Sequence, residues 1–193
     1  MAYATFAELA RAAEVAGSLG AAALDREAED SGADVAGLLE RMDRELAVME
    51  EAVASGLGER ERSRSGLTGG DAALIAAGPG IAGPLFRQVV ADAVAVGETN
   101  ARMGRVVAAP TAGASGIVPG VLLSLARTRA SERGELVSAL FAAGAVGAVI
   151  ASRATLSGAA GGCQAEVGAA SAMAAAAGAE LLGAAPDVCG QAA

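Results

Sequence analysis

Seventeen uncharged residues, Leu136-Val-Ser-Ala-Leu-Phe-Ala-Ala-Gly-Ala-Val-Gly-Ala-Val-Ile-Ala-Ser152, set the expectation for the whole chain. Alanine, valine and glycine make up most of this run, and it lacks the alternating β-branched and aromatic residues that are typical of strands. Small side chains allow helices to approach closely. The run therefore predicts a buried helix, and the chain is expected to be mainly α.

A second uncharged run spans residues 106–126, and both runs are close to the length that crosses a membrane. The longer run contains Pro110 and Pro119, and both runs are rich in alanine and glycine, which insert weakly into lipid. The preferred interpretation is that both runs are buried helices of a protein that does not cross a membrane. A membrane-associated helical module stays open as the alternative.

Composition excludes several kinds of chemistry. The 193 residues include no histidine and no tryptophan, and all fourteen basic residues are arginines. Without lysine the chain cannot form a Schiff base with pyridoxal phosphate, and without histidine it cannot supply a Ser-His-Asp triad or a histidine zinc ligand. A pI near 4.6 argues against non-specific nucleic-acid binding. Two cysteines are too few for a disulfide scaffold, and no signal-peptide pattern is present, so we expect a cytoplasmic protein.

Hydrophobic periodicity predicts one helical domain with glycine-rich connecting loops. It divides into N-terminal helices (1–57), a polar loop (58–71) and an apolar helical body (72–193). Val106-Val107 is the one candidate for a short extended segment. The predicted helices cover residues 5–17, 21–30, 34–55, 71–77, 84–103, 119–130, 134–152 and 166–183.

The polar loop Gly58-Glu-Arg-Glu-Arg-Ser-Arg-Ser-Gly-Leu-Thr-Gly-Gly-Asp71 interrupts the alanine-rich composition. A surface linker is the preferred interpretation, since loops are generally rich in serine and glycine. The alternative is an anion-binding loop, in which Arg64 and the unhindered backbone N–H groups around Ser65-Gly66 and Thr68-Gly69-Gly70 bind a ligand.

The connector Arg105-Val-Val-Ala-Ala-Pro-Thr-Ala-Gly-Ala-Ser-Gly-Ile-Val-Pro-Gly120 is the first candidate for chemistry. A helix starting near Pro119 would present free N–H groups to a carboxylate, with the Thr111 and Ser115 hydroxyls as added donors. In the alternative interpretation, Gly113 and Gly116 only allow tight helix packing. The glycine spacing matches neither a dinucleotide loop nor a phosphate loop.

The second connector is Ser157-Gly-Ala-Ala-Gly-Gly-Cys-Gln-Ala-Glu-Val-Gly168. Cys163 follows two glycines and precedes a helical stretch, where the helix dipole favours a thiolate that could bind a metal. The alternative is a buried cysteine that serves only packing. Polar neighbours Gln164 and Glu166 weaken that alternative, whereas Cys189 has no such setting and is expected to be a packing residue.

These segments resemble the alpha subunit of iron–sulfur-dependent L-serine ammonia-lyase, also called L-serine dehydratase. The similarity is carried by three blocks, Ser63–Asp71, Ala109–Gly120 and Gly161–Ala174, and extends to Glu98–Gly104. It implies a helical catalytic domain that converts L-serine to pyruvate and ammonium. It also implies a [4Fe–4S] cluster with one open iron that acts as a Lewis acid on the serine hydroxyl.

By this resemblance Cys163 is the first cluster ligand. The family's other two ligands lie in Cys-Asp-Pro and Pro-Cys segments that this sequence does not contain, and Cys189 matches neither. We therefore expect an alpha chain that is incomplete at its C-terminus and inactive alone.

The resemblance also implies partners and substrate contacts. A beta subunit with a Ser-Ser-His motif would supply a histidine that acts as the base or binds the substrate, in a homo- or hetero-oligomer. L-serine would lie at Thr111, Gly113, Ser115 and Gly116 of the first connector, with Ser65, Gly66 and Thr68 of the polar loop nearby. A non-enzymatic helical scaffold and a cluster-dependent hydro-lyase for a hydroxy acid are the competing hypotheses.

Overall fold

The computed structural model describes residues 3–59, 61–79 and 83–193, so parts of the three predicted segments (residues 1–2, 60 and 80–82) lie outside the described residues. The described residues contain helices and no strand, which confirms the predicted mainly α class. The helices are α1 (Phe6–Ala16), α2 (Leu19–Ser31), α3 (Val35–Gly58), α4 (Asp71–Ala77), α5 (Pro84–Ala101), α6 (Ile117–Arg129), α7 (Arg133–Ala151), α8 (Gly158–Gly161), α9 (Cys163–Leu181) and α10 (Pro186–Ala192).

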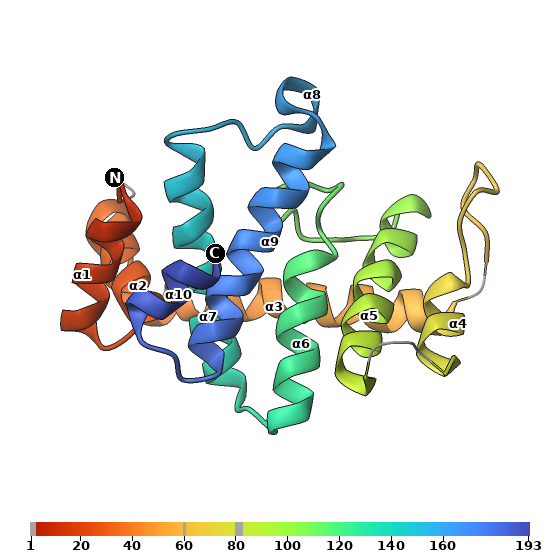
Figure 1. Ribbon diagram of the computed structural model, residues 1–193, viewed down its shortest axis with the longest axis horizontal. Helices are drawn as coiled ribbons and strands as arrows, with labels where there is room; N and C mark the ends of the chain where they lie inside the picture. Colours follow the sequence, from red (N-terminus) through yellow and green to blue (C-terminus); the bar gives the residue numbers. More distant parts are fainter. Residues whose placement is uncertain (1–2, 60, 80–82) are drawn as a thin grey trace.

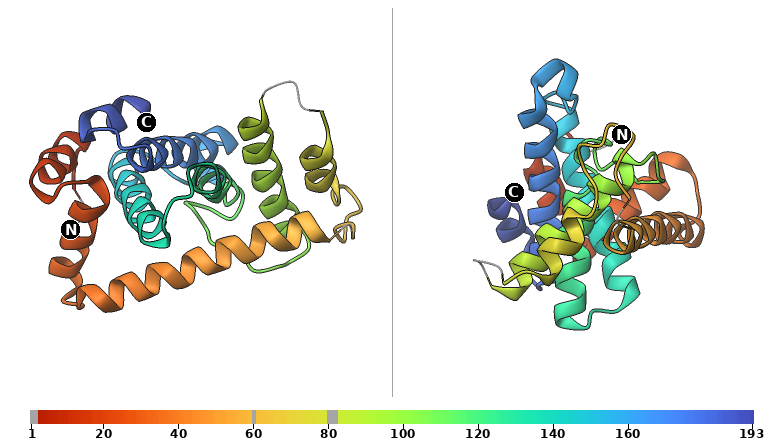
Figure 2. Two further views of the ribbon diagram at one scale, coloured as in Figure 1. Left: turned by 90° about the horizontal axis from the view of Figure 1, so that it is seen from below. Right: turned by 90° about the vertical axis from the view of Figure 1, so that its right-hand side faces the viewer.

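The long helix α3 runs along one side of the molecule, and the other helices stand across it (Figures 1 and 2). Helices α1, α2 and α10 gather at one end of α3, and α4 lies at the other. Between them, α9 packs against α7 and α6, and α6 packs against α5. Residues 104–116, between α5 and α6, and residues 152–162, between α7 and α9, include parts of the two glycine-rich connectors. Both segments lie on the same side of this row of helices (Figure 1).

Local sequence signals explain most helix boundaries. The side chains of Thr5, Ser18 and Asp34 accept hydrogen bonds from the first turns of α1, α2 and α3. Gly17 and Gly32 end α1 and α2 in the left-handed conformation that favours glycine.

Some predicted details are wrong. Helix α9 begins at Cys163, three residues earlier than predicted, and α3 ends at Gly58, three residues later than predicted. The short helices α8 and α10 were not predicted, because neither is long enough to show a hydrophobic period. Residues 104–108 belong to no helix and to no strand, so the short extended segment at Val106-Val107 stays a prediction.

Helix packing relies on glycine at close backbone crossings. A Cβ atom on Gly56 of α3 would lie 2.0 Å from the carbonyl oxygen of Ala95 in α5. A Cβ atom on Gly116, before α6, would lie 2.2 Å from the carbonyl oxygen of Ala93 in α5. Both distances are shorter than any side chain tolerates, so the positions of α3 and α6 on α5 require glycine at these two points.

The uncharged run of residues 136–152 forms most of α7. Its length and hydropathy would suit a membrane span, but 56% of its most apolar window is buried within the protein. Helices α2, α3 and α9 cover it. This burial agrees with the preferred interpretation of a core helix.

Two carboxylates, one buried and one half-buried, tie helices together. Asp92 of α5 is fully buried; it accepts a hydrogen bond from the hydroxyl of Ser124 in α6 at 2.8 Å and pairs with Arg127. Glu180 of α9 accepts hydrogen bonds from the N–H groups of Leu19 and Gly20 at 2.5 and 3.0 Å. Glu180 thereby caps the first turn of α2.

The crossing of α3 and α5 gives a first prediction. Replacing Gly56 by alanine should lower the free energy of unfolding by about 1–3 kcal/mol, because the added methyl group forces the two backbones apart. Gly97 is the matched control: it lies inside α5, is exposed and has nothing near its Cβ position. Gly97→Ala should raise the free energy of unfolding by about 0.5–1 kcal/mol through helix propensity alone. Urea unfolding followed by circular dichroism measures both, and equal effects of the two substitutions would contradict the packing argument.

Candidate functional site

The two glycine-rich connectors meet at the first turn of α9. The hydroxyl of Thr111, in the first connector, donates a hydrogen bond to the Glu166 carboxylate at 2.7 Å. A Cβ atom on Gly113 would lie 2.8 Å from Oε1 of Glu166, and one on Gly158, in the second connector, would lie 3.0 Å from the same carboxylate. Residues 45 or more positions apart in the sequence therefore close on one carboxylate.

Cys163 lies at the same end of α9. It is the first residue of the helix and is exposed, and Gly162 before it has a φ of +79° that glycine adopts without strain. Cys163 and Glu166 are three positions apart, so their side chains start from the same side of the helix. The thiol and the carboxylate thus belong to one surface.

The hydroxyl groups of the first connector do not have free protons. Thr111 is half-buried and donates to Glu166, while its oxygen accepts from the N–H of Ala114 at 3.3 Å. Ser115 is 1% exposed and donates to the carbonyl oxygen of Ala112 at 2.7 Å. Since a hydroxyl has one proton, neither group can act as the direct donor that the sequence suggested while this arrangement holds.

Gly113 and Gly116 have different surroundings. Gly113 is exposed beside Glu166, whereas Gly116 is buried against α5 and serves the packing role that the sequence left open. Within the described part of the chain, the N–H groups of Ala112 and Gly113 have no acceptor. Both residues are exposed, so these N–H groups are the donors that this connector offers to a ligand.

The polar loop is held by α5. Glu98 of α5 is 1% exposed, and its carboxylate accepts hydrogen bonds from the N–H groups of Gly70 and Asp71 at 3.0 and 2.7 Å. Arg102, one turn further along α5, lies 3.9 Å from Glu98. The N–H groups at the start of α4 are therefore occupied by Glu98, which removes part of the anion-binding loop that the sequence suggested.

Ser65, Gly66 and Thr68 lie away from the connectors. Their loop lies at the α4 end of the molecule, beyond α5, as Figure 1 and the left view of Figure 2 show. In the described residues their hydrogen bonds stay inside the loop: the hydroxyls of Ser63 and Ser65 are 3.0 Å apart, and Ser63 N–H donates to the carbonyl of Thr68 at 2.8 Å. Among the described residues, no hydrogen bond joins them to the Cys163 end of α9.

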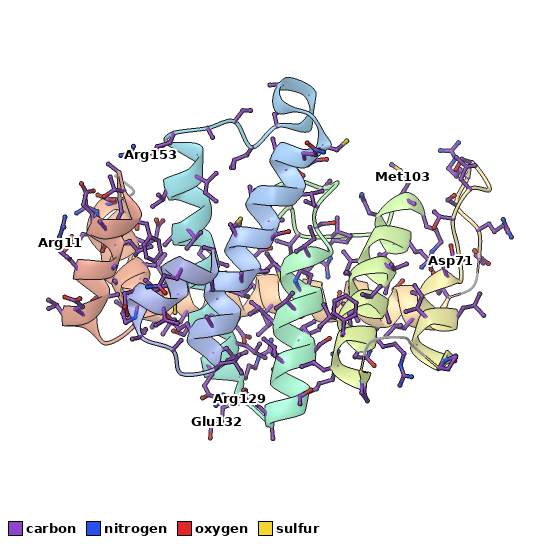
Figure 3. The ribbon with its side chains drawn as sticks, viewed as in Figure 1. Arg11, Asp71, Met103, Arg129, Glu132 and Arg153 are labelled. Atoms are coloured by element: carbon purple, nitrogen blue, oxygen red, sulfur yellow. The ribbon has the colours of Figure 1, made fainter. Side chains whose placement is uncertain are left out.

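The end of α5 links these two regions. Glu98 holds the start of α4, and Asn100 donates from its side chain to the carbonyl of Ala112 at 3.2 Å. Asp71 marks the start of α4 and Met103 the turn after α5, and both lie at the α4 end of the molecule (Figure 3). The sequence did not identify Glu98, Asn100 or the bridging role of Glu166 as part of the site. The available signals were the resemblance of Glu98–Gly104 to the family and the polar character of Glu166 beside Cys163.

The two cysteine thiols decide whether the described residues could hold an iron–sulfur cluster. Cys163 is exposed, but Cys189 of α10 is fully buried near the opposite end of α9. Burial raises the pKa of the Cys189 thiol, and the nearby Glu180 carboxylate raises it further. The described residues contain no group of three metal-binding side chains. They offer one ligand and do not by themselves fit a cubane cluster, whose retention needs several thiolates.

The chain is thus a helical body with glycine-rich connecting loops, as predicted, and two of these loops meet at the thiol end of α9. Residues 12–193 match the family model described as serine dehydratase alpha chain. The chain belongs to the serine dehydratase alpha chain family.

Several curated proteins are similar to this chain. It is 49% identical over 154 residues to "Probable L-serine dehydratase, alpha chain" of Bacillus subtilis, covering 78% of this chain and 51% of that protein. It is 45% identical over 106 residues to "L-serine dehydratase, alpha chain" of Peptoniphilus asaccharolyticus, covering 55% of this chain and 36% of that protein. "L-serine dehydratase 1" of Escherichia coli is 52% identical over 96 residues, covering 49% and 21%. The matched region spans about half the length of the Bacillus subtilis protein and a smaller share of the other two.

The contrast between the thiols gives a second prediction. At pH 8, iodoacetamide should label Cys163 in the folded chain and leave Cys189 unmodified, because burial and a raised pKa both reduce the reactive thiolate at Cys189. Peptide mass spectrometry measures the two sites, and both cysteines should react in denaturant. Faster labelling of Cys189 than of Cys163 in the folded chain would contradict the structure.

Proposed function

We propose that this chain provides the substrate-binding connector and one cofactor thiolate of an L-serine dehydratase, which converts L-serine to pyruvate and ammonium. The observation that carries the proposal is the meeting of Thr111 and Gly113 with the Cys163 end of α9. These residues lie in the blocks that resemble the family and within the range 12–193 that matches the family model, and proteins named L-serine dehydratase are similar to this chain.

The first connector suits the carboxylate of an amino acid. The N–H groups of Ala112 and Gly113 are exposed and have no acceptor in the described part of the chain. The small side chains around them leave the backbone accessible, and backbone N–H groups next to a helix start bind carboxylates well. Thr111 and Gly113 would contact the substrate directly, whereas buried Ser115 and Gly116 would keep the connector in place. Ser65, Gly66 and Thr68 remain predicted substrate residues whose contact requires a rearrangement of their loop.

The cofactor of this proposal is a [4Fe–4S] cluster, with Cys163 as one ligand. Cys163 is exposed at the first position of α9, so its thiol is accessible to a cluster. The chain has no other accessible thiol, so the remaining ligands would come from outside these residues.

The same proposal includes partners. The chain has neither histidine nor lysine, so its acid–base chemistry would have to use its carboxylates, a thiol or a residue of a partner. A beta subunit, as the resemblance implies, would supply a histidine for this purpose and complete an oligomeric enzyme. The chain without this partner and without further cluster ligands would be inactive.

Pyruvate formation tests the proposal. The chain, assembled with a beta subunit and the missing cluster ligands under anaerobic conditions, should convert L-serine to pyruvate and ammonium. Cys163→Ala should abolish this activity and the iron content, because a cluster ligand is lost. Cys189→Ala is the matched control and should retain both, because that thiol is buried at the other end of α9.

Three outcomes contradict the proposal: full activity of Cys163→Ala, a stable cluster on the isolated chain, or dehydration of a hydroxy acid in place of L-serine.

A further inference from the structure

Glu166 has an unusual position for a charged residue in this protein. It is half-buried in the first turn of α9, and its one hydrogen-bond donor in the described residues is the hydroxyl of Thr111, at 2.7 Å. No arginine of the described residues pairs with it, whereas Asp92, Glu98 and Glu59 each lie within 4 Å of an arginine. An ion pair therefore does not explain its position.

Glycines make room for this carboxylate. A Cβ atom on Gly113 would lie 2.8 Å from Oε1 of Glu166, and one on Gly158 would lie 3.0 Å from the same oxygen. Any other residue at these two positions would push the carboxylate away from Thr111. Both connectors are thus shaped around Glu166 as well as around each other.

The hydrogen bond to Glu166 fixes the direction of the Thr111 proton. A hydroxyl has one proton and two lone pairs. The proton is donated to Glu166, and one lone pair accepts the N–H of Ala114 at 3.3 Å. The second lone pair is left, so Thr111 can accept a hydrogen bond from a ligand but cannot donate one.

We propose that Glu166 is a positioning residue that makes Thr111 a hydrogen-bond acceptor toward the substrate and ties residues 109–116 to α9. The group that Thr111 receives must then be a donor, either the ammonium or the hydroxyl of the substrate, and not its carboxylate. This inference rests on the proposed function for the identity of the substrate, but the link between Glu166 and Thr111 does not depend on it.

Hydrogen exchange of the isolated chain tests the link without any turnover. Glu166→Ala and Thr111→Val should both speed amide exchange in residues 109–116, and the double variant should exchange no faster than Thr111→Val alone, because both changes remove the same bond. Glu166→Gln should exchange like the wild type, since its side-chain carbonyl can still accept the Thr111 proton. Glu180→Gln, the same change at the other end of α9, is the matched control and should leave exchange in 109–116 unchanged.

Kinetics of the assembled enzyme tests the consequence for the substrate. Glu166→Ala and Thr111→Val should each raise KM for L-serine by about tenfold or more, the effect of losing a hydrogen bond to a charged group. The double variant should match Thr111→Val, and Glu166→Gln should keep a KM near the wild-type value. Loss of helix stability alone would not produce this pattern, which thermal unfolding of the same variants checks.

Additive effects in the double variant, or Glu166→Gln as damaging as Glu166→Ala, would overturn the inference while leaving serine dehydration intact. Coupled exchange in an assembled enzyme that forms no pyruvate would refute the proposed function and still support the positioning role.

Discussion

Backbone contact between helices is the constraint on which the rest of this structure depends. Gly56 and Gly116 set α3 and α6 against the backbone of α5, at distances that leave no space for a methyl group. The connector of residues 104–116 runs between α5 and α6, so the close packing of these helices fixes both of its ends. Held in this way, the connector brings Thr111 to Glu166 of α9. The small residues are therefore needed to place the site as well as to fill the core.

Carboxylates provide the second level of organisation. The chain is acidic, with a net charge of −8 and no lysine or histidine, and several of its acids serve as ties between helices. Glu98 and Glu180 accept from the free N–H groups at the starts of α4 and α2, and Asp92 joins α5 to α6. Each of them satisfies helix ends or buried hydroxyls that an apolar core would otherwise leave unpaired. Glu166 does the same for the two connectors.

The sequence predicted the helical class, most helix boundaries and the connector around Thr111, because hydrophobic spacing, caps and glycine-rich breaks are local signals. It did not predict α8 or α10, which are too short to show a period. It also placed Ser65, Gly66 and Thr68 near the other substrate residues, whereas their loop lies beyond α5. The separation of that loop from the first connector is a property of the whole fold, and neither residue type nor spacing carries such information. The roles of Glu98, Asn100 and Glu166 depend on the same long-range arrangement.

Residues 112–113 lie beside the Cys163 end of α9, whereas the polar loop lies beyond α5. A nitroxide spin label on the exposed thiol of Cys163 tests this most directly, through its broadening of backbone amide signals in nuclear magnetic resonance spectra. The structure predicts strong broadening for Ala112 and Gly113 and much weaker broadening for Ser65 and Thr68. Equal broadening of the two groups, or sharp signals for Ala112 and Gly113, would contradict it.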